Sequence, residues 1–170
     1  LRLADFAAHR GEWVAPRGVD YHGYTLYELP PNGQGFAALI MLNILKHTDL
    51  RQYERGSVEV FHYLVEAKRL AFEAMARTFA DPEFAEVPVD WLLSDDFAQS
   101  QFSRIRKDAV LTPDALAEKL EGEGDTTYLT VADSDGMMVS LIQSNYRGMG
   151  SGLVPTGLGF MLQDRGELFS

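Results

Sequence analysis

The stretch Asp125-Thr126-Thr127-Tyr128-Leu129-Thr130-Val131 decides how the rest of this chain is interpreted. β-branched and aromatic residues fill it and favour a strand. The acidic run Glu121-Gly122-Glu123-Gly124 precedes it, and we expect that run to be an exposed linker. A cut between Asp125 and Thr126 would free an α-amine of pKa near ~7.7 to 8, able to act as base for the threonine hydroxyl. Alternatively, Thr126 is simply a β-branched residue suited to a sheet.

The predicted strand should form a hairpin with the segment that follows it. Asp133-Ser134-Asp135-Gly136 is typical of a type I turn with Gly136 in the left-handed conformation, the three-residue loop that carries a G1 bulge. Such a loop places Asp133 opposite Met137 and thereby fixes every other pair along the two strands.

That register sorts the cross-strand pairs onto two faces. One face is apolar and holds the pairs Leu129 with Leu141 and Val131 with Val139. The other face holds the pairs Thr130 with Ser140, Tyr128 with Ile142 and Thr126 with Ser144. A slip of one residue would mix the faces, so the clean separation supports the register. We therefore expect the Ser144 hydroxyl beside the Thr126 hydroxyl, although Ser144 is alternatively an ordinary polar residue at a strand end.

A glycine-rich loop, residues 145–155, follows the hairpin and contains Gly148, Gly150 and Gly152. No helical pattern follows it, so the context of a dinucleotide-binding fingerprint is absent. Glycines of this kind permit close approach of the backbone to a ligand or to another strand.

Taken together, these segments closely resemble the γ-glutamyltranspeptidase (γ-glutamyltransferase) family. The resembling segments near the hairpin are residues 124–128, 131–136, 139–141, 144–145, 148–152, 155, 157, 159–162 and 169–170. Those upstream are residues 29–35, 42–45, 62, 66–69 and 81–82. Their order and spacing match over nearly the whole chain. The pattern is most similar to the bacterial γ-glutamyltransferase-like branch, in which Asn32-Gly33-Gln34-Gly35 replaces a serine pair.

The resemblance implies an α+β fold, part of the four-layer αββα sandwich of the N-terminal-nucleophile (Ntn) hydrolases, with an α-helical large-subunit segment. It implies a zymogen that cuts itself before Thr126. Residues 1–125 would then be the C-terminal part of the large-subunit region, and residues 126–170 the start of the small-subunit region. The chain looks like a fragment, because the family's paired oxyanion glycines and its carboxylate-binding arginine are expected outside it.

The implied activity is that of a γ-glutamyltransferase acting on γ-glutamyl amides of the glutathione type. In that scheme Thr126 forms an acyl-enzyme, Ser144 orients it, and Gly148, Gly150 and Gly152 line the substrate pocket. Water, an amino acid or a peptide resolves the acyl-enzyme. A cephalosporin or glutaryl acylase of the Ntn type is the first alternative, and a non-catalytic fragment or pseudoenzyme is the second.

Three positions depart from the best-studied members in a way that bears on the substrate. Tyr146, Arg165 and Leu168 replace an asparagine, a glutamine and an aspartate that bind the α-amine of the γ-glutamyl group. An arginine has no acceptor for an ammonium. Either Glu167 or Asp164 holds the amine, or the preferred acyl group lacks one and Arg165 binds a carboxylate. Arg165 is alternatively a solvated or structural arginine.

Composition narrows the remaining classes. The chain has 170 residues, 46% of them hydrophobic, which is enough for the core of one domain. A formal net charge of −10 argues against a nucleic-acid partner. No apolar run approaches the ~18 residues of a membrane span. The partners that the resemblance implies are a small acyl-amide substrate and the rest of the chain's own precursor, while the compartment, cytoplasmic or periplasmic, stays open.

No cofactor or metal is expected. The chain has no cysteine, and its four histidines, His9, His22, His47 and His62, lack metal-ligand spacing. The hairpin turn has too few oxygen ligands for calcium. His62 and Glu66, four residues apart, are placed to pair on one helix face.

Capping and periodicity predict the remaining elements. The expected strands are Trp13–Val19 and Tyr24–Leu29. The expected helices are Leu3–Ala8, Gln34 or Gly35 to Leu45, one capped by Ser57 and reaching about Phe79, Asp90–Arg106 with a break near Ser94, and a short one from Thr112-Pro113.

Overall fold

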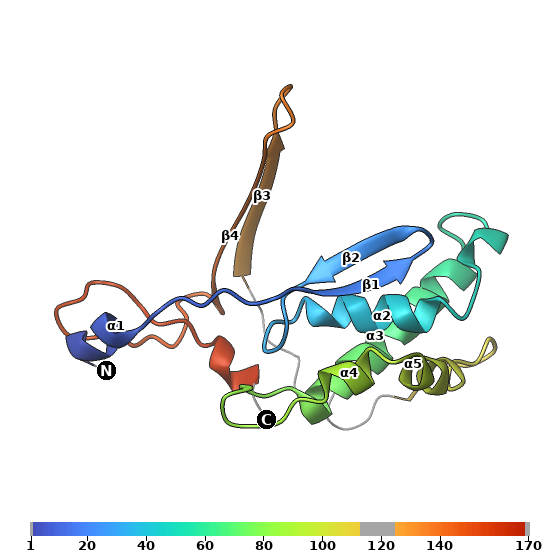
Figure 1. The fold of residues 1–170 in the computed structure, drawn as a ribbon, viewed down its shortest axis with the longest axis horizontal. Coiled ribbons are helices and arrows are strands. Elements are labelled where there is room, and N and C mark those ends of the chain that lie inside the picture. Colours follow the sequence, from blue (N-terminus) through green and yellow to red (C-terminus); the bar gives the residue numbers. More distant parts are fainter. Residues whose placement is uncertain (1, 113–124, 169–170) are drawn as a thin grey trace. The chain divides into compact units, whose positions relative to one another are not determined.

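A computed structural model describes residues 2–112 and 125–168. The predicted α+β class is confirmed, and Figure 1 labels the elements. They are α1 (Leu3–Ala8), β1 (Arg17–Tyr21), β2 (Tyr24–Glu28), α2 (Phe36–Leu45), η1 (Leu50–Gln52), α3 (Val58–Thr78), α4 (Val89–Leu92), α5 (Asp95–Phe102), β3 (Asp125–Ala132), β4 (Met138–Tyr146) and η3 (Arg165–Leu168). The described residues divide into two units, 13–112 and 2–12 with 125–168, which are treated separately below. The predicted helix from Thr112-Pro113 and the acidic linker lie outside the described residues.

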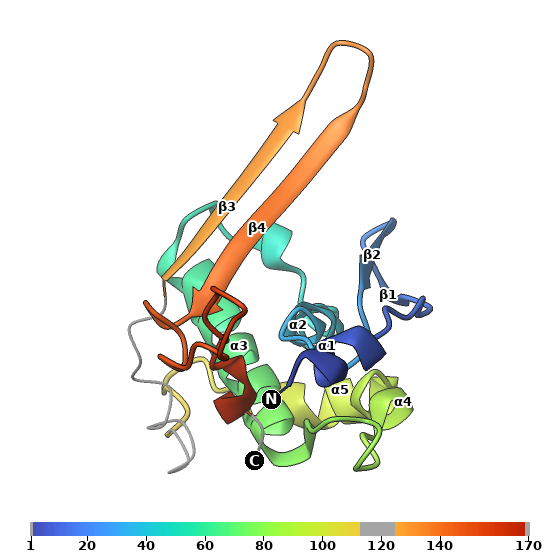
Figure 2. The ribbon, with the colours of Figure 1, turned by 90° about the vertical axis from the view of Figure 1, so that its left-hand side faces the viewer.

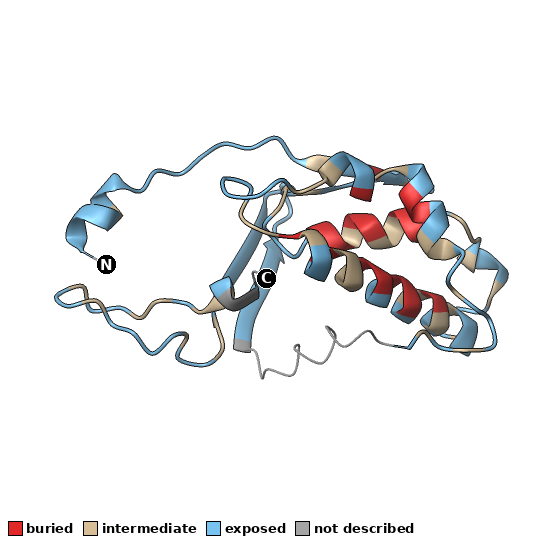
Figure 3. Cartoon of the chain, turned by 90° about the horizontal axis from the view of Figure 1, so that it is seen from below, coloured by how far each residue is buried: buried red, intermediate tan, exposed pale blue. Residues whose placement is uncertain are grey.

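The core of the first unit is built between α2 and α3. Apart from Asn43, helix α2 is apolar around its circumference, and its Phe36, Leu39, Ile40 and Ile44 are fully buried. The buried residues of α3 recur at spacings of three and four: Tyr63, Glu66, Ala67, Leu70, Ala71 and Met75. Figure 3 shows the buried positions concentrated on these two helices. The predicted cap is confirmed, because Ser57 Oγ accepts a hydrogen bond from the Val60 N–H at 3.4 Å.

Strands β1 and β2 form an antiparallel hairpin that packs on α2 through the buried Val19. The predicted start of the first strand at Trp13 is wrong, because β1 begins at Arg17 and continues to Tyr21. Pro16 has no N–H to give to a ladder, and Trp13 lies fully exposed before it. The aromatic and β-branched residues before Pro16 favour a strand by their side chains, but the backbone begins the strand only after the proline.

Ser94 separates α4 from α5, as the predicted break required. Its Oγ accepts a hydrogen bond from the Phe97 N–H at 3.1 Å and caps α5. Helix α5 ends at Phe102, earlier than the predicted Arg106. The buried Asn43 of α2 fixes this region, because its Nδ2 donates to the Leu93 carbonyl at 2.9 Å.

Side chains of α3 hold the segment that leads toward residue 112. His62 does not form the predicted pair with Glu66; its Nε2 donates instead to the Arg106 carbonyl at 2.7 Å. The Glu66 carboxylate, 0% exposed, accepts from the Leu111 N–H at 2.7 Å and from Arg69 at 3.0 Å. Each oxygen of the buried carboxylate thus has a donor other than His62.

The second unit contains the long β3–β4 hairpin (Figure 1 and Figure 2). Its turn is the predicted one: Gly136 has φ 83°, and the Asp133 N–H donates to the Met137 carbonyl at 3.1 Å. The predicted pairs Tyr128–Ile142, Leu129–Leu141, Thr130–Ser140 and Val131–Val139 are all present. Side chains on both faces are exposed. In the same unit, Phe6 of α1 packs edge to face on Phe160, with ring centroids 5.5 Å apart.

Candidate active site

Thr126 and Ser144 lie side by side at the open end of the hairpin. The Thr126 hydroxyl donates a hydrogen bond to Ser144 Oγ at 2.9 Å, the proximity that the register predicted. Asp125 pairs with Tyr146 while Thr127 pairs with Gln143, so β4 carries one extra residue at this point. This bulge re-aims the end of β4 without separating the two hydroxyls.

Ser144 Oγ is the point on which three donors converge. Besides the Thr126 hydroxyl, it accepts from the Tyr146 N–H at 2.8 Å and from Arg165 Nη2 at 3.3 Å. A hydroxyl oxygen has two lone pairs, so the three donors share its acceptor capacity. The Ser144 oxygen therefore ties the start of β3, the end of β4 and η3 together.

Tyr146 occupies an unusual backbone conformation beside this oxygen. Its φ is 79°, in the left-handed region, which costs of order 1–3 kcal/mol for a residue other than glycine. The hydrogen bond from its N–H to Ser144 offsets part of that cost. Its ring carries the Arg165 guanidinium at 4.9 Å from the centroid, and that of Arg147 at 5.7 Å.

The glycine-rich loop folds back and carries η3 to the hairpin. Gly148, Gly150 and Gly152 all have positive φ, at 33°, 63° and 69°. A side chain at Gly150 would collide with the Leu162 carbonyl oxygen, so this position requires glycine for close backbone approach. The N–H and hydroxyl of Ser151 both donate to that same oxygen at 2.9 Å.

Residues 147–153 and 162–164 together form a segment that we call the strap. A second set of hydrogen bonds holds it together. The Leu162 N–H donates to the Leu153 carbonyl at 3.1 Å, and the Asp164 N–H donates to the Asn145 carbonyl at 3.3 Å. Asp164 Oδ1 accepts from the Arg147 N–H at 3.3 Å. These bonds place Arg165 next to Ser144, a contact that no local sequence pattern signals. The lining role of the three glycines stays a prediction.

The uncut chain lacks one part of the predicted machinery. The nitrogen of Thr126 is here the amide nitrogen of the Asp125–Thr126 peptide bond, which has no basic lone pair. The Thr126 side chain is exposed, and Ser144 is half-buried. The Thr126 hydroxyl is thus in position, and the α-amine that would act as its base would exist only after the chain is cut.

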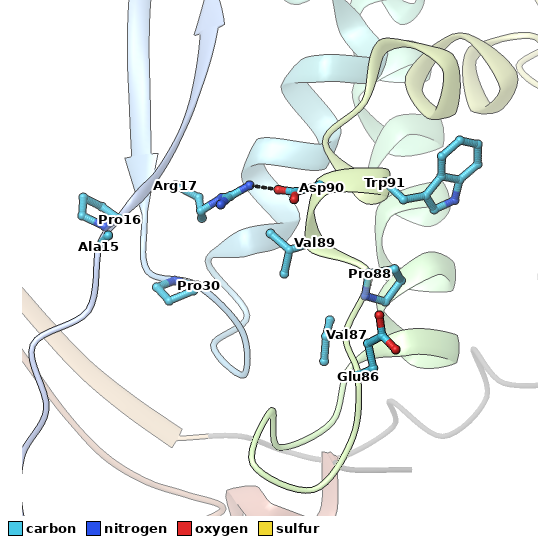
Figure 4. Close-up of a pocket in the computed structure, with 10 residues that line it drawn as sticks. All are labelled: Ala15, Pro16, Arg17, Pro30, Glu86, Val87, Pro88, Val89, Asp90 and Trp91. Atoms are coloured by element: carbon cyan, nitrogen blue, oxygen red, sulfur yellow. Dashed lines mark hydrogen bonds and ion pairs between the residues drawn. The ribbon is translucent and has the colours of Figure 1, made fainter.

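A surface pocket of about 470 Å³ occurs in the other unit, and sequence patterns did not single it out. Figure 4 shows its lining, in which Arg17 and Asp90 form an ion pair and Trp91 lies at the rim. Its remaining lining residues are Ala15, Pro16, Pro30, Glu86, Val87, Pro88 and Val89. None of the ten carries a hydroxyl, thiol or imidazole, and the Asp90 carboxylate is paired with Arg17.

Other charged groups in that unit have structural explanations. Hydrogen bonds from Arg51 lower the pKa of Asp49, and those from Arg106 lower the pKa of Asp108.

Within residues 2–112 and 125–168, no group of three or more acidic or histidine side chains could hold a metal ion. No helix in these ranges is long and apolar enough to cross a membrane.

The chain is similar to known proteins along its full length. Residues 1–170 match the family model described as Gamma-glutamyltranspeptidase. The chain is 42% identical over 170 residues to the glutathione hydrolase-like YwrD proenzyme of Bacillus subtilis (strain 168), covering 100% of this chain and 31% of that protein. It is 33% identical to the oxamate amidohydrolase proenzyme of Klebsiella pneumoniae, with coverages of 100% and 31%.

A solved structure agrees with the sequence comparison. The crystal structure of cephalosporin acylase from Bacillus halodurans matches with a TM-score of 0.77 at 40% identity, over 98% of this chain and 29% of that one. The chain thus spans about a third of the length of these relatives, because it covers 31% of each of the two proenzymes. Because the family model covers all 170 residues, the chain belongs to the γ-glutamyltranspeptidase family.

Proposed function

We propose that the parent protein, meaning the protein whose gene encodes these residues, is an amidohydrolase of the γ-glutamyltransferase type with Thr126 as its nucleophile. The observation that carries this proposal is the Thr126 hydroxyl, bonded to Ser144 Oγ at 2.9 Å directly after Asp125. The names of its relatives, a glutathione hydrolase-like proenzyme and an oxamate amidohydrolase proenzyme, support the same class.

Self-cleavage is the first step of the proposed mechanism. The Thr126 hydroxyl attacks the carbonyl carbon of Asp125, and the peptide C–N bond breaks as an ester to Thr126 Oγ forms. Water hydrolyses this ester, which leaves a carboxylate on Asp125 and a free α-amine on Thr126. Residues 1–125 then end the large-subunit region, and residues 126–170 begin the small-subunit region.

Amide cleavage reuses the same hydroxyl. The α-amine takes the proton as Oγ attacks the substrate carbonyl carbon, and the resulting ammonium returns a proton to the leaving nitrogen as the C–N bond breaks. Water, an amino acid or a peptide amine then cleaves the ester. Ser144 holds the threonine in one rotamer, which keeps the nucleophile aimed.

The hairpin fits the sandwich that this family membership leads us to propose. Leu129, Val131, Val139 and Leu141 form an apolar face that is exposed in the described residues. A two-stranded hairpin is at best marginally stable alone, so its faces need further strands or a helix layer. We assign those layers to the rest of the precursor, in the αββα arrangement of the Ntn hydrolases.

Within this class, a γ-glutamyl hydrolase or transferase is the first candidate and an acylase is the second. Tyr146 and Arg165 favour the acylase, because they stand where the resemblance places amine-binding residues, and the solved relative is named a cephalosporin acylase. A non-catalytic parent remains the outcome that would refute both.

Activity of the full-length parent tests the proposal. We expect release of p-nitroaniline from γ-glutamyl or glutaryl p-nitroanilide, with glycylglycine added to reveal transfer. Thr126→Ala should abolish release, whereas Thr127→Ala, a neighbour on the opposite face of the strand, should retain it. Equal activity of the Thr126→Ala variant and the wild type would refute the assignment of the nucleophile.

A further inference from the structure

Arg165 places a charged group in hydrogen-bond contact with the hydroxyl pair. Its Nη2 lies 3.3 Å from Ser144 Oγ, and Ser144 Oγ lies 2.9 Å from Thr126 Oγ1. A single oxygen atom therefore bridges the guanidinium and the candidate nucleophile. An acyl group that reaches Thr126 from the side of Ser144 therefore comes close to this cation.

Two features hold the guanidinium in place. It stacks on the Tyr146 ring at 4.9 Å, and the strap of residues 147–153 and 162–164 fixes the backbone on which it stands. Tyr146 itself is fixed by its N–H bond to Ser144. A planar cation held in this way has little rotamer freedom left to lose when it binds a ligand.

Arg165 has no carboxylate partner among the residues that the structure describes. None of the ion pairs among the described residues includes Arg165. The nearest acidic neighbour in sequence, Asp164, accepts from the backbone N–H of Arg147. The half-buried guanidinium thus has donors left over for a ligand.

We propose that Arg165 binds a carboxylate of the acyl group whose amide bond Thr126 cleaves, and that the preferred acyl groups carry no α-amine. This rests on the proposed function. Guanidinium and carboxylate match as a two-pronged, charge-assisted pair. The guanidinium would repel an ammonium at the same place and offers it no acceptor. Dicarboxylic monoamides such as glutaryl amides therefore fit this site better than γ-glutamyl amides.

Three anilides separate the possibilities on the full-length parent. Glutaryl p-nitroanilide has the carboxylate and no amine, its glutaramyl analogue has a carboxamide in place of the carboxylate, and γ-glutamyl p-nitroanilide adds the α-amine. We expect kcat/KM for the glutaryl substrate to exceed that for the glutaramyl analogue by about 10- to 100-fold, the worth of a charge-assisted pair.

Variants assign that preference to one residue. Arg165→Gln should remove the preference for glutaryl over glutaramyl, and should shift the kcat/KM ratio toward the γ-glutamyl substrate. Arg165→Lys, which keeps the charge but loses the planar fork, should retain part of it. Arg10→Gln removes an exposed arginine of the same unit, whose guanidinium donates to the Ala7 and His9 carbonyls; it is the control and should keep the wild-type preference.

Glutarate binding gives a readout that needs no turnover. Isothermal titration of the processed enzyme should show a Kd that rises about 10- to 100-fold in Arg165→Gln and stays within about twofold in Arg10→Gln. A processed, active parent in which Arg165→Gln leaves both the preference and the Kd unchanged would overturn this inference alone. A parent that is neither cut nor active would overturn the proposed function and the inference together.

Discussion

Ser144 Oγ accepts the Thr126 hydroxyl at 2.9 Å across a point where the hairpin register breaks. Further along, the two strands pair in regular register from Thr127–Gln143 to Ala132–Met138. The extra residue in β4 turns the Tyr146 N–H toward the same oxygen. The bulge thus directs the Tyr146 N–H to Ser144, whereas in a regular ladder this N–H would not point at that oxygen.

Removing the Ser144 hydroxyl should slow amide cleavage without unfolding the protein. Ser144→Ala deprives the threonine of its orienting acceptor, so we expect kcat/KM of the full-length parent to fall about 5- to 20-fold. Ser140→Ala is the matched control, because Ser140 bonds Tyr128 on the same face of the hairpin at 2.9 Å. Its effect should stay within about twofold. Equal losses in the two variants would show that Ser144 acts only through general hairpin stability.

The glycine strap should tolerate an added methyl group at one position and not at another. Gly150→Ala brings a Cβ into the Leu162 carbonyl, while Gly152→Ala meets no atom within 4 Å at a similar φ. Both variants carry the cost of a left-handed alanine, about 1–2 kcal/mol. Only Gly150→Ala should also displace the strap, with a larger drop in melting temperature and in kcat/KM. Identical melting curves for the two variants would contradict this account of the loop.

Glu66 should be the most sensitive acidic position of the helical unit. Glu66→Ala removes the buried acceptor of the Leu111 N–H and the partner of the exposed Arg69, so we expect a loss of about 1–3 kcal/mol in the free energy of unfolding. Glu66→Gln keeps an acceptor for the Leu111 N–H and should lose less. Glu59→Ala, at an exposed position of the same helix, should change stability by less than about 0.5 kcal/mol. Urea unfolding measures the free energy of unfolding of all three variants. A loss below about 1 kcal/mol in Glu66→Ala would refute this role of the Glu66 carboxylate.

Activity should follow the titration of an α-amine. The base must be neutral to take the threonine proton, so kcat/KM should rise with pH and level off above about 8, near the ordinary pKa of a terminal amine of ~7.7 to 8. Glutaryl p-nitroanilide is the suitable substrate, because its carboxylate stays ionised across this range. A profile that is flat from about pH 6 to 9 would point to a different base.

The hairpin was predictable because its determinants are local. The turn residues Asp133–Gly136 fix the loop, and the alternation of apolar and polar residues fixes the faces. Together they gave the Thr126–Ser144 contact without any tertiary information. The bulge at the end of β4 was not predicted, because Tyr146 with positive φ carries none of the residue preferences that mark such a conformation.

Contacts between segments that lie far apart in the chain could not be predicted from sequence patterns. The position of Arg165 depends on backbone bonds between residues 151–153 and 162–164, which leave no periodic pattern. His62 was placed beside Glu66 by helical spacing, yet each bonds a backbone group more than forty residues away, at Arg106 and Leu111. Propensity describes neighbours along the chain, whereas buried polar groups take whichever partner the tertiary fold supplies.

The N-terminal sequence of the small fragment tests the central claim most directly. Full-length parent, purified and left to process, should yield a fragment that begins Thr126-Thr127-Tyr128, while Thr126→Ala stays one uncut chain and Thr127→Ala is still cut. That result would establish Thr126 as both the site and the agent of the cut. A fragment that begins at any other residue, or a wild-type chain that stays whole while hydrolysing amides, would contradict the account.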